Sequence, residues 1–151
     1  MSQPGSRHDA ADQSPGFLLW RATLSWQRQI RAALSPHALT HVQFVLLASL
    51  WWLHDHGSGP PSQQELAAHA GTDPMMTSQV LRKLDARNLV DRHADPDDSR
   101  AMQVTLTDAG RTLLRAALAD VEAADEAYFG ALGNQRDAFT RALSRLSAPG
   151  S

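Results

Sequence analysis

The 151-residue chain contains no cysteine, so disulfide bonds, cysteine metal ligands and thiolate nucleophiles are all excluded. Long apolar runs are also missing. The longest, around residues 45–47 and 50–53, fall far short of the about 20 residues that a membrane-spanning helix needs. No apolar signal core stands near the N-terminus. We therefore expect a cytoplasmic protein with no membrane segment.

Sequence motifs for catalysis are absent as well. The chain has no phosphate-binding glycine loop, no nucleophile elbow and no helical His-Glu-x-x-His motif. Two pairs of histidines raise the question of a metal site. His54 and His56 would point apart on a helix, and no carboxylate accompanies His37 and His41 at ligand spacing. We therefore expect no enzyme, no metal site and no cofactor.

An excess of positive charge, the usual mark of a nucleic-acid-binding domain, is not found either, since the formal net charge is −2 at pH 7. The charge is unevenly distributed, however. Between residues 82 and 92 the basic side chains outnumber the acidic ones. The basic residues are Arg82, Lys83, Arg87 and Arg92, and the acidic ones are Asp85 and Asp91. The overall charge therefore counts against nucleic-acid binding without excluding it.

The hydrophobic content of 42% is ordinary for one globular domain, and the apolar residues follow helical patterns. Residues 17–34 carry apolar side chains on two faces, which indicates two packing partners, and Pro36 ends this helix. Thr40 and Gln43 form a capping box for a second helix, residues 42 to about 54. This helix is apolar nearly all round and is therefore predicted to be the buried centre of the fold.

The next segment predicts a helix-turn-helix. Gly57 is expected to end the central helix in a left-handed conformation. A second capping box, residues 62–65, opens a short helix that ends at Gly71. Asp73 then caps another helix, with Pro74 at its first position, where the missing N–H costs nothing. Two short helices joined by a glycine-containing turn are typical of a helix-turn-helix.

A β-hairpin is expected to follow. Residues 89–94 predict a strand, residues 95–99 are dense in turn formers, and residues 102–106 alternate between apolar and polar side chains. Thr107 caps a long helix from residue 108 to about residue 129, and Asn134 with Asp137 opens a last one. The predicted fold class is therefore mainly α with a small β-hairpin wing, a winged helix-turn-helix with N- and C-terminal dimerisation helices.

The second helix of the predicted motif has two distinct faces. Thr77, Val80, Leu81 and Leu84 follow i, i+3, i+4, i+7 spacing, so they should pack on the core. The opposite face carries side chains that can read base edges by hydrogen bonds and apolar contact. They are Met75, Ser78, Gln79 and Arg82, and the neighbouring Lys83 and Arg87 suit phosphates. The alternative is an ordinary solvated helix face.

Arg100 stands just past the acidic turn of the hairpin, at its tip or at the start of the outgoing strand. A cation there can enter the narrow, negative minor groove of DNA. The alternative is a surface ion pair with Asp97 or Asp98, worth under about 1 kcal/mol. Both can hold, because an aspartate that orients Arg100 would pre-organise it.

These segments together resemble the MarR family. The similarity is most specific where an Asp-x-Arg wing, Asp98 and Arg100, is followed by Leu-Thr-x-x-Gly at residues 106–110. Residues 66–90, which span the predicted helix-turn-helix, resemble the family as well. Asn88 replaces a frequent glycine, and asparagine tolerates a left-handed conformation. Pro74 is a second departure, and it can displace a polar contact to DNA.

The resemblance implies a homodimer with a winged-helix domain at residues 17–146. The DNA-binding part would span about 40–107, and the dimerisation helices about 17–34 and 108–146. Residues 1–16 are expected to be a disordered arm and residues 147–151 a flexible tail. The apolar stripes of the outer helices support a dimer independently, the alternative being a monomeric bundle.

The resemblance also implies a cleft that holds a small aromatic or anionic effector. Trp26, Arg28 and His41 are the candidates for it, although tryptophans are more often core or interface anchors. The predicted function is that of a sequence-specific regulator of transcription that binds duplex DNA. It would be a repressor that acts on a palindromic operator and is released by an effector. The alternative is a winged-helix module that binds protein or RNA without effector control.

Overall fold

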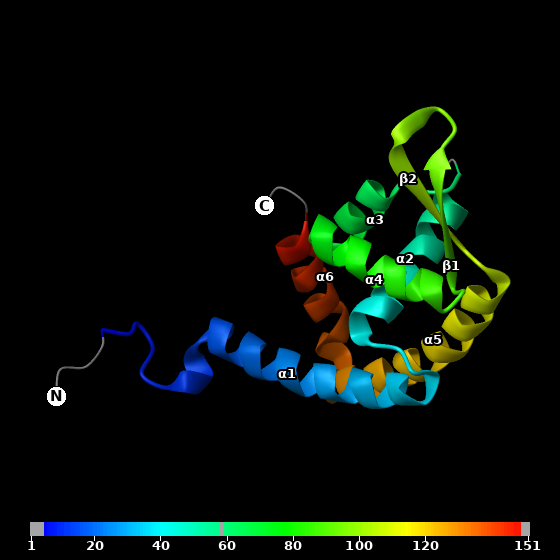
Figure 1. Cartoon of the computed structure of the whole chain (residues 1–151). Helices are drawn as coiled ribbons and strands as arrows, with labels where there is room; N and C mark the ends of the chain where they lie inside the picture. Colours follow the sequence, from blue (N-terminus) through cyan, green and yellow to red (C-terminus); the bar gives the residue numbers. More distant parts are fainter. Residues whose placement is uncertain (1–4, 58, 149–151) are drawn as a thin grey trace.

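The computed structural model describes residues 5–57 and 59–148, and within them the fold is mainly helical with one two-stranded sheet (Figure 1). This confirms the predicted fold class. The helices are α1 (Pro15–Leu34), α2 (His41–His56), α3 (Gln63–Ala70), α4 (Pro74–Ala86), α5 (Asp108–Phe129) and α6 (Arg136–Ser147). The strands are β1 (Val90–Asp95) and β2 (Asp98–Leu106), and three short 3-10 turns are η1 (Ala11–Gln13), η2 (Ser35–His37) and η3 (Gly130–Gln135).

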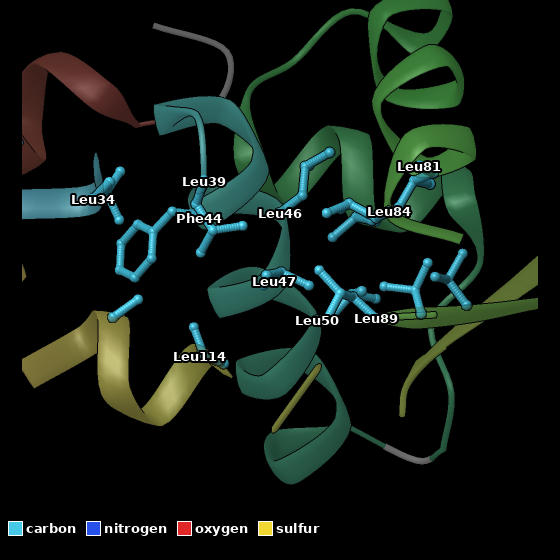
Figure 2. Close-up of a cluster of buried hydrophobic side chains, with 14 of the residues drawn as sticks. Leu34, Leu39, Phe44, Leu46, Leu47, Leu50, Leu81, Leu84, Leu89 and Leu114 are labelled. Carbon is cyan, nitrogen blue, oxygen red and sulfur yellow. The ribbon is translucent and has the colours of Figure 1, made fainter. Parts of the chain in front are cut away.

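Helix α2 forms the centre of the core, as its apolar composition predicts. Leu46, Leu47 and Leu50 are buried to within 1% of complete, and α4, α5 and the sheet surround them (Figure 2). The surrounding side chains include Leu81 and Leu84 of α4, Val90 and Val104 of the sheet, Leu114 of α5, and Ile30 and Leu34 of α1. One continuous core thus joins the helix-turn-helix to the long helix α5 and to the C-terminal end of α1.

The starts of α2 and α4 follow the predicted capping chemistry. The Thr40 hydroxyl accepts the Gln43 amide at 3.2 Å, and the Gln43 side chain accepts the Thr40 amide at 3.0 Å. At α4, the Asp73 carboxylate accepts the amides of Met75 and Met76. Side-chain caps therefore satisfy the first free N–H groups of these helices, which fixes where the chain turns into each helix.

The junction between the wing and α5 explains two residues of the Leu-Thr-x-x-Gly segment. The Thr107 hydroxyl donates to the Asn88 carbonyl at 2.7 Å and accepts the Gly110 amide at 2.9 Å. A Cβ on Gly110 would overlap the Leu89 carbonyl oxygen, so only glycine lets α5 approach β1 this closely. Asn88 takes the left-handed conformation expected of it, with φ of 60°.

Two predicted helix ends are wrong. Gly57 is extended, with φ of −109° and ψ of −176°, and a Cβ on it would collide with the Leu53 carbonyl oxygen. Glycine is thus required there for close approach and not for a left-handed turn. Asn134 does not cap α6, because η3 continues into that helix and the preceding residue, Gln135, is already helical.

Helix α1 also begins earlier than predicted. Ser14 accepts the Phe17 amide at 3.2 Å, so the helix starts at Pro15, inside the segment expected to be a disordered arm. The 3-10 turn η1 precedes it in the same segment. Residues 1–4 of the expected arm and residues 149–151 of the expected tail lie outside the described residues, and Ser147 is the last residue of α6.

The outer helices leave apolar side chains uncovered. Helix α1 contacts α5, yet its N-terminal half extends away from the rest of the fold (Figure 1). Trp20 is 62% exposed there, and Leu146 of α6 is 74% exposed. Phe17, Leu18, Leu19 and Phe139 are exposed as well. No single helix among the described residues is long and apolar enough to cross a membrane; α1 with η2 and α2 would qualify only as a pair bent by 77°.

Candidate nucleic-acid interface

Helix α4 has the two faces that the sequence predicts. Thr77, Leu81 and Leu84 are completely buried, and Val80 is half-buried. The Thr77 hydroxyl lies 2.6 Å from that of Thr72 and donates to the Asp73 carbonyl at 2.9 Å, which satisfies its polar group inside the core. The opposite face is open. Met75 is 71% exposed, Gln79, Arg82 and Lys83 are exposed, and Ser78 is half-buried.

The basic residues around α4 divide into two pairs. Arg82 and Lys83 form no ion pair or side-chain hydrogen bond within residues 5–57 and 59–148, so their charges face solvent. Arg87 instead donates to the Ala38 carbonyl at 2.7 Å, and Arg92 lies 3.5 Å from the Asp85 carboxylate. Arg87 was predicted to suit a phosphate. Its guanidinium already forms a hydrogen bond with the segment before α2, so a structural role competes with a phosphate contact.

The wing is a short antiparallel hairpin that is joined to the helix-turn-helix. Its register pairs Val90 with Leu106 and Arg92 with Val104, and it shifts at the tip, after Ala94. A bridge between Ser62 and Gln103 adds the residue before α3 to the edge of the hairpin. The position of the wing relative to α3 is therefore fixed by backbone pairing.

Arg100 lies in β2, which begins at Asp98, so it belongs to the outgoing strand and not to the tip. The Asp98 carboxylate accepts the backbone amide of Arg100 at 3.0 Å. The Asp95 carboxylate accepts the amide of Asp97 at 2.8 Å in the same way. The aspartates thus fold the turn. Among the described residues the surface ion pair considered for Arg100 is not formed, and its guanidinium is left exposed and unpaired.

A hollow of about 280 Å³ lies between the wing and the starts of α3 and α4. Its lining brings Arg100 and Met102 of β2 next to Pro74 and to Gln63 and Gln64. The side-chain oxygen of Gln63 is buried without a hydrogen-bond partner among the described residues. The sequence analysis did not identify Gln63 and Gln64 of α3 as neighbours of the wing. The polar residues directly after the Ser62 cap were the signal that could have indicated it.

Of the three candidate effector residues, Trp26 and His41 contact each other, whereas Arg28 is exposed. The Trp26 indole donates to the Asp125 carboxylate at 2.8 Å and meets the His41 ring edge-on, with centroids 5.1 Å apart. Burial lowers the pKa of His41; the Asp125 carboxylate opposes this and Arg31 adds to it. Trp26 lines an apolar groove of about 570 Å³ between α1, α5 and α6 that His41 does not line. Arg28 is exposed and lines none of the described cavities.

The histidine pairs considered for a metal have other neighbours. His37 donates to the Asp120 carboxylate at 2.6 Å. His56 stacks on the Trp52 ring, with centroids 3.7 Å apart, and donates to the Trp52 carbonyl. In the parts of the chain that the structure covers, no three side chains of metal-binding type come together.

Comparison with known proteins assigns the chain to a family. The MarR family sequence profile matches residues 39–102. The HTH-type transcriptional regulator YdcH of Bacillus subtilis is 40% identical, over 93% of this chain and 95% of that protein. The HTH-type transcriptional repressor Rv2887 of Mycobacterium tuberculosis is 38% identical, over 91% of this chain and 97% of that protein.

Solved structures agree with this assignment. The transcriptional repressor CouR bound to a 23-mer DNA duplex matches with a TM-score of 0.84 and 26% identity, over 97% of this chain and all of that one. Rv2887 in complex with DNA matches with a TM-score of 0.68 and 36% identity, over 89% and 98% of the two chains. Rv2887 has also been solved with salicylic acid. The chain therefore belongs to the MarR family of HTH-type transcriptional regulators.

Proposed function

We propose that this chain represses transcription by binding a palindromic duplex operator as a homodimer. The observation that carries the proposal is the open face of α4, where Arg82 and Lys83 are exposed and, among the described residues, unpaired. The wing beside it presents Arg100 in the same state. A helix of this kind fits the major groove, where Gln79 and Arg82 suit adenine and guanine. Lys83 suits a phosphate, and Arg100 suits the minor groove.

The uncovered apolar side chains of α1 and α6 support the homodimer. A monomeric soluble protein rarely leaves large apolar patches in contact with water. A two-fold contact between these helices would bury Trp20, Leu146 and the groove that Trp26 lines. It would also place the two α4 helices about one DNA turn apart, so the operator should be a palindrome.

Effector control is supported by the relatives. Rv2887 is found with salicylic acid and with p-aminosalicylic acid, and the DNA binding of BpsR from Bordetella bronchiseptica is regulated by 6-hydroxynicotinic acid. These are aromatic carboxylic acids, and we extend this ligand class to the present protein. Trp26, Arg28 and His41 remain predicted effector contacts. The protein would act by binding and not by catalysis, in the cytoplasm where its DNA lies.

Selection of bound sequences from random duplex DNA, followed by titration at two salt concentrations, tests the proposal. The expected result is a palindrome with half-sites about one helical turn apart and a steep loss of affinity with salt. No enrichment, together with weak binding that disappears at physiological salt, would contradict DNA-binding function.

The Arg100→Ala variant separates duplex-DNA binding from the alternative of a protein- or RNA-binding module. Loss of the minor-groove cation should weaken binding to the selected palindrome. A wing that serves a protein partner should tolerate the same change. Asp97→Ala, at the hairpin tip, is the control for the hairpin itself.

A further inference from the structure

The methionines within the described residues all lie on α4 or on the wing. They are Met75 and Met76, at the start of α4, and Met102, in β2. Met75 is 71% exposed, Met76 is 39% exposed and Met102 is 37% exposed, although methionine is ordinarily among the buried residue types. The two places adjoin, since Met102 lines the same hollow as Pro74, which directly precedes Met75. Thioether groups are therefore concentrated on the surface that carries the candidate DNA contacts.

Met75 is the most accessible of the three. The Asp73 carboxylate accepts its backbone amide at 3.0 Å, so its backbone is held in place while its side chain reaches solvent. The side chain stands on the open face of α4, one turn before Gln79. A dissolved oxidant can therefore reach the sulfur atom, and a chemical change there leaves the packing of the core untouched.

The chain offers an oxidant no thiol, because it contains no cysteine. The thioether of methionine is the remaining side-chain sulfur, and hydrogen peroxide converts it to the sulfoxide. The sulfur atom attacks one peroxide oxygen, and an S–O bond forms as the O–O bond breaks. The sulfur loses two electrons, and the departing hydroxide takes the proton of the transferred oxygen and leaves as water. Methionine sulfoxide reductases reverse this oxidation, so it can serve as a signal.

Oxidation would change what α4 presents to DNA. An apolar side chain that can pack on a thymine methyl group becomes a polar one with a strong hydrogen-bond acceptor. Burying that oxygen in a contact without a donor lowers the affinity about tenfold. The same oxygen can also accept the side-chain amide of Gln79, one turn along the helix, and hold it away from an adenine.

We propose that Met75 is a site of reversible oxidation by peroxides and that its sulfoxide weakens operator binding. The effect on DNA rests on the proposed function, which this modification deepens by adding a form of regulation. The switch acts within the DNA-contacting face itself, independently of an effector cleft.

Peptide mass spectrometry of the full-length protein after mild treatment with hydrogen peroxide tests the site without DNA. Met75 should gain one oxygen atom faster than Met76 and Met102, because more of its side chain is exposed. Equal or slower oxidation of Met75 would overturn the assignment of the site. In the complex with the selected palindrome, oxidation of Met75 should be slowed, and an unchanged rate at saturating DNA would remove the residue from the interface and overturn the proposal.

Titration of the palindrome before and after peroxide treatment measures the effect on affinity. The oxidised wild type should bind about tenfold more weakly, and methionine sulfoxide reductases with a thiol reductant should restore binding. Each variant is compared with itself, and Met75→Leu should show no change on treatment. The matched control, Met76→Leu combined with Met102→Leu, should remain sensitive. Met75→Gln, which places a polar group at the same position, should bind as weakly as the oxidised wild type.

Thermal melting should show that the oxidised protein is as stable as the untreated one, since Met75 lies outside the core. Early melting would place the damage in the core and overturn the proposal. A loss of affinity that persists in Met75→Leu would overturn it as well. If the palindrome is found but peroxide leaves its affinity unchanged, the operator proposal stands and the switch fails. If no palindrome is found but Met75 is oxidised first and reversibly, the operator proposal fails and the modification site stands.

Discussion

The winged-helix part and the outer helices of this protein differ in how far their apolar side chains are buried. In α2, four apolar residues are buried, Phe44, Leu46, Leu47 and Leu50, and the neighbouring α4 and sheet bury the side chains that face it. In the 20 residues of α1 only Ile30 and Leu34 are buried, both near its C-terminal end, and α6 has no buried residue. This contrast indicates that the winged-helix part is complete within one chain, whereas the outer helices are complete only when a second copy covers them.

The largest expected effect comes from disrupting the core of the winged-helix part. Leu84→Ala removes a fully buried side chain of α4 and should lower the free energy of unfolding by about 2–5 kcal/mol. Chemical denaturation measures this. Leu146→Ala, at a 74% exposed position of α6, is the control and should unfold like the wild type when both are compared as monomers. Equal destabilisation by the two variants would remove the contrast between the regions.

Trp20→Ala should weaken the contact between two copies at the outer helices and leave the winged-helix part folded. If Trp20 is an interface anchor, its truncation costs about 2 kcal/mol of association, a factor of about 30 in the dimer dissociation constant. Sedimentation measures that constant, and circular dichroism should show an unchanged helix content. His69→Ala, at an exposed position of α3, is the control. A monomeric wild type would contradict the idea that a second copy covers α1.

A pair of arginines allows a finer test within the winged-helix part. Arg82→Ala should weaken binding to the selected operator by about 1–3 kcal/mol and relax its specificity, with little effect on folding. Arg87→Ala should instead lower the unfolding free energy by about 1 kcal/mol, since its guanidinium holds the Ala38 carbonyl. Filter binding and denaturation measure the two effects. The assignment of the α4 faces is wrong if Arg82→Ala binds DNA as the wild type does.

The smallest effect is expected where the two regions meet, at His41. Burial lowers the pKa of this histidine below its ordinary value of 6.5, so His41 is protonated less readily in the folded state than in the unfolded state. Unfolded chains therefore take up more protons as the pH falls below about 6.5, and stability should decrease in that range. Melting temperatures between pH 8 and 5 measure this decrease. It should be shallower in His41→Gln, and an identical pH profile would contradict the role of burial.

Much of the fold could be predicted because its signals are local. Thr40 interacts with Gln43, Asp73 with the amides of Met75 and Met76, and Thr107 with Gly110, all within one helical turn, and each cap marks a helix start that the structure confirms. The i, i+3, i+4, i+7 spacing likewise separated the buried and open faces of α4.

The errors and omissions arise where contacts link residues far apart in the chain. Arg87 is 49 residues from the carbonyl that it holds, and Trp26 is 99 residues from Asp125. Trp26 of α1 and His41 of α2 do lie in contact, whereas Arg28 is exposed, and the role of these residues as effector contacts stays a prediction.

Local sequence signals therefore set the order of the elements, most helix starts, the wing and the side chains that α4 presents to solvent. These depend on hydrogen bonds and periodicities within a few residues. The tertiary structure was needed to establish which cations are unpaired among the described residues and which of the described apolar side chains remain uncovered. Each of these depends on which distant segments come into contact, and local spacing carries no information about such contacts.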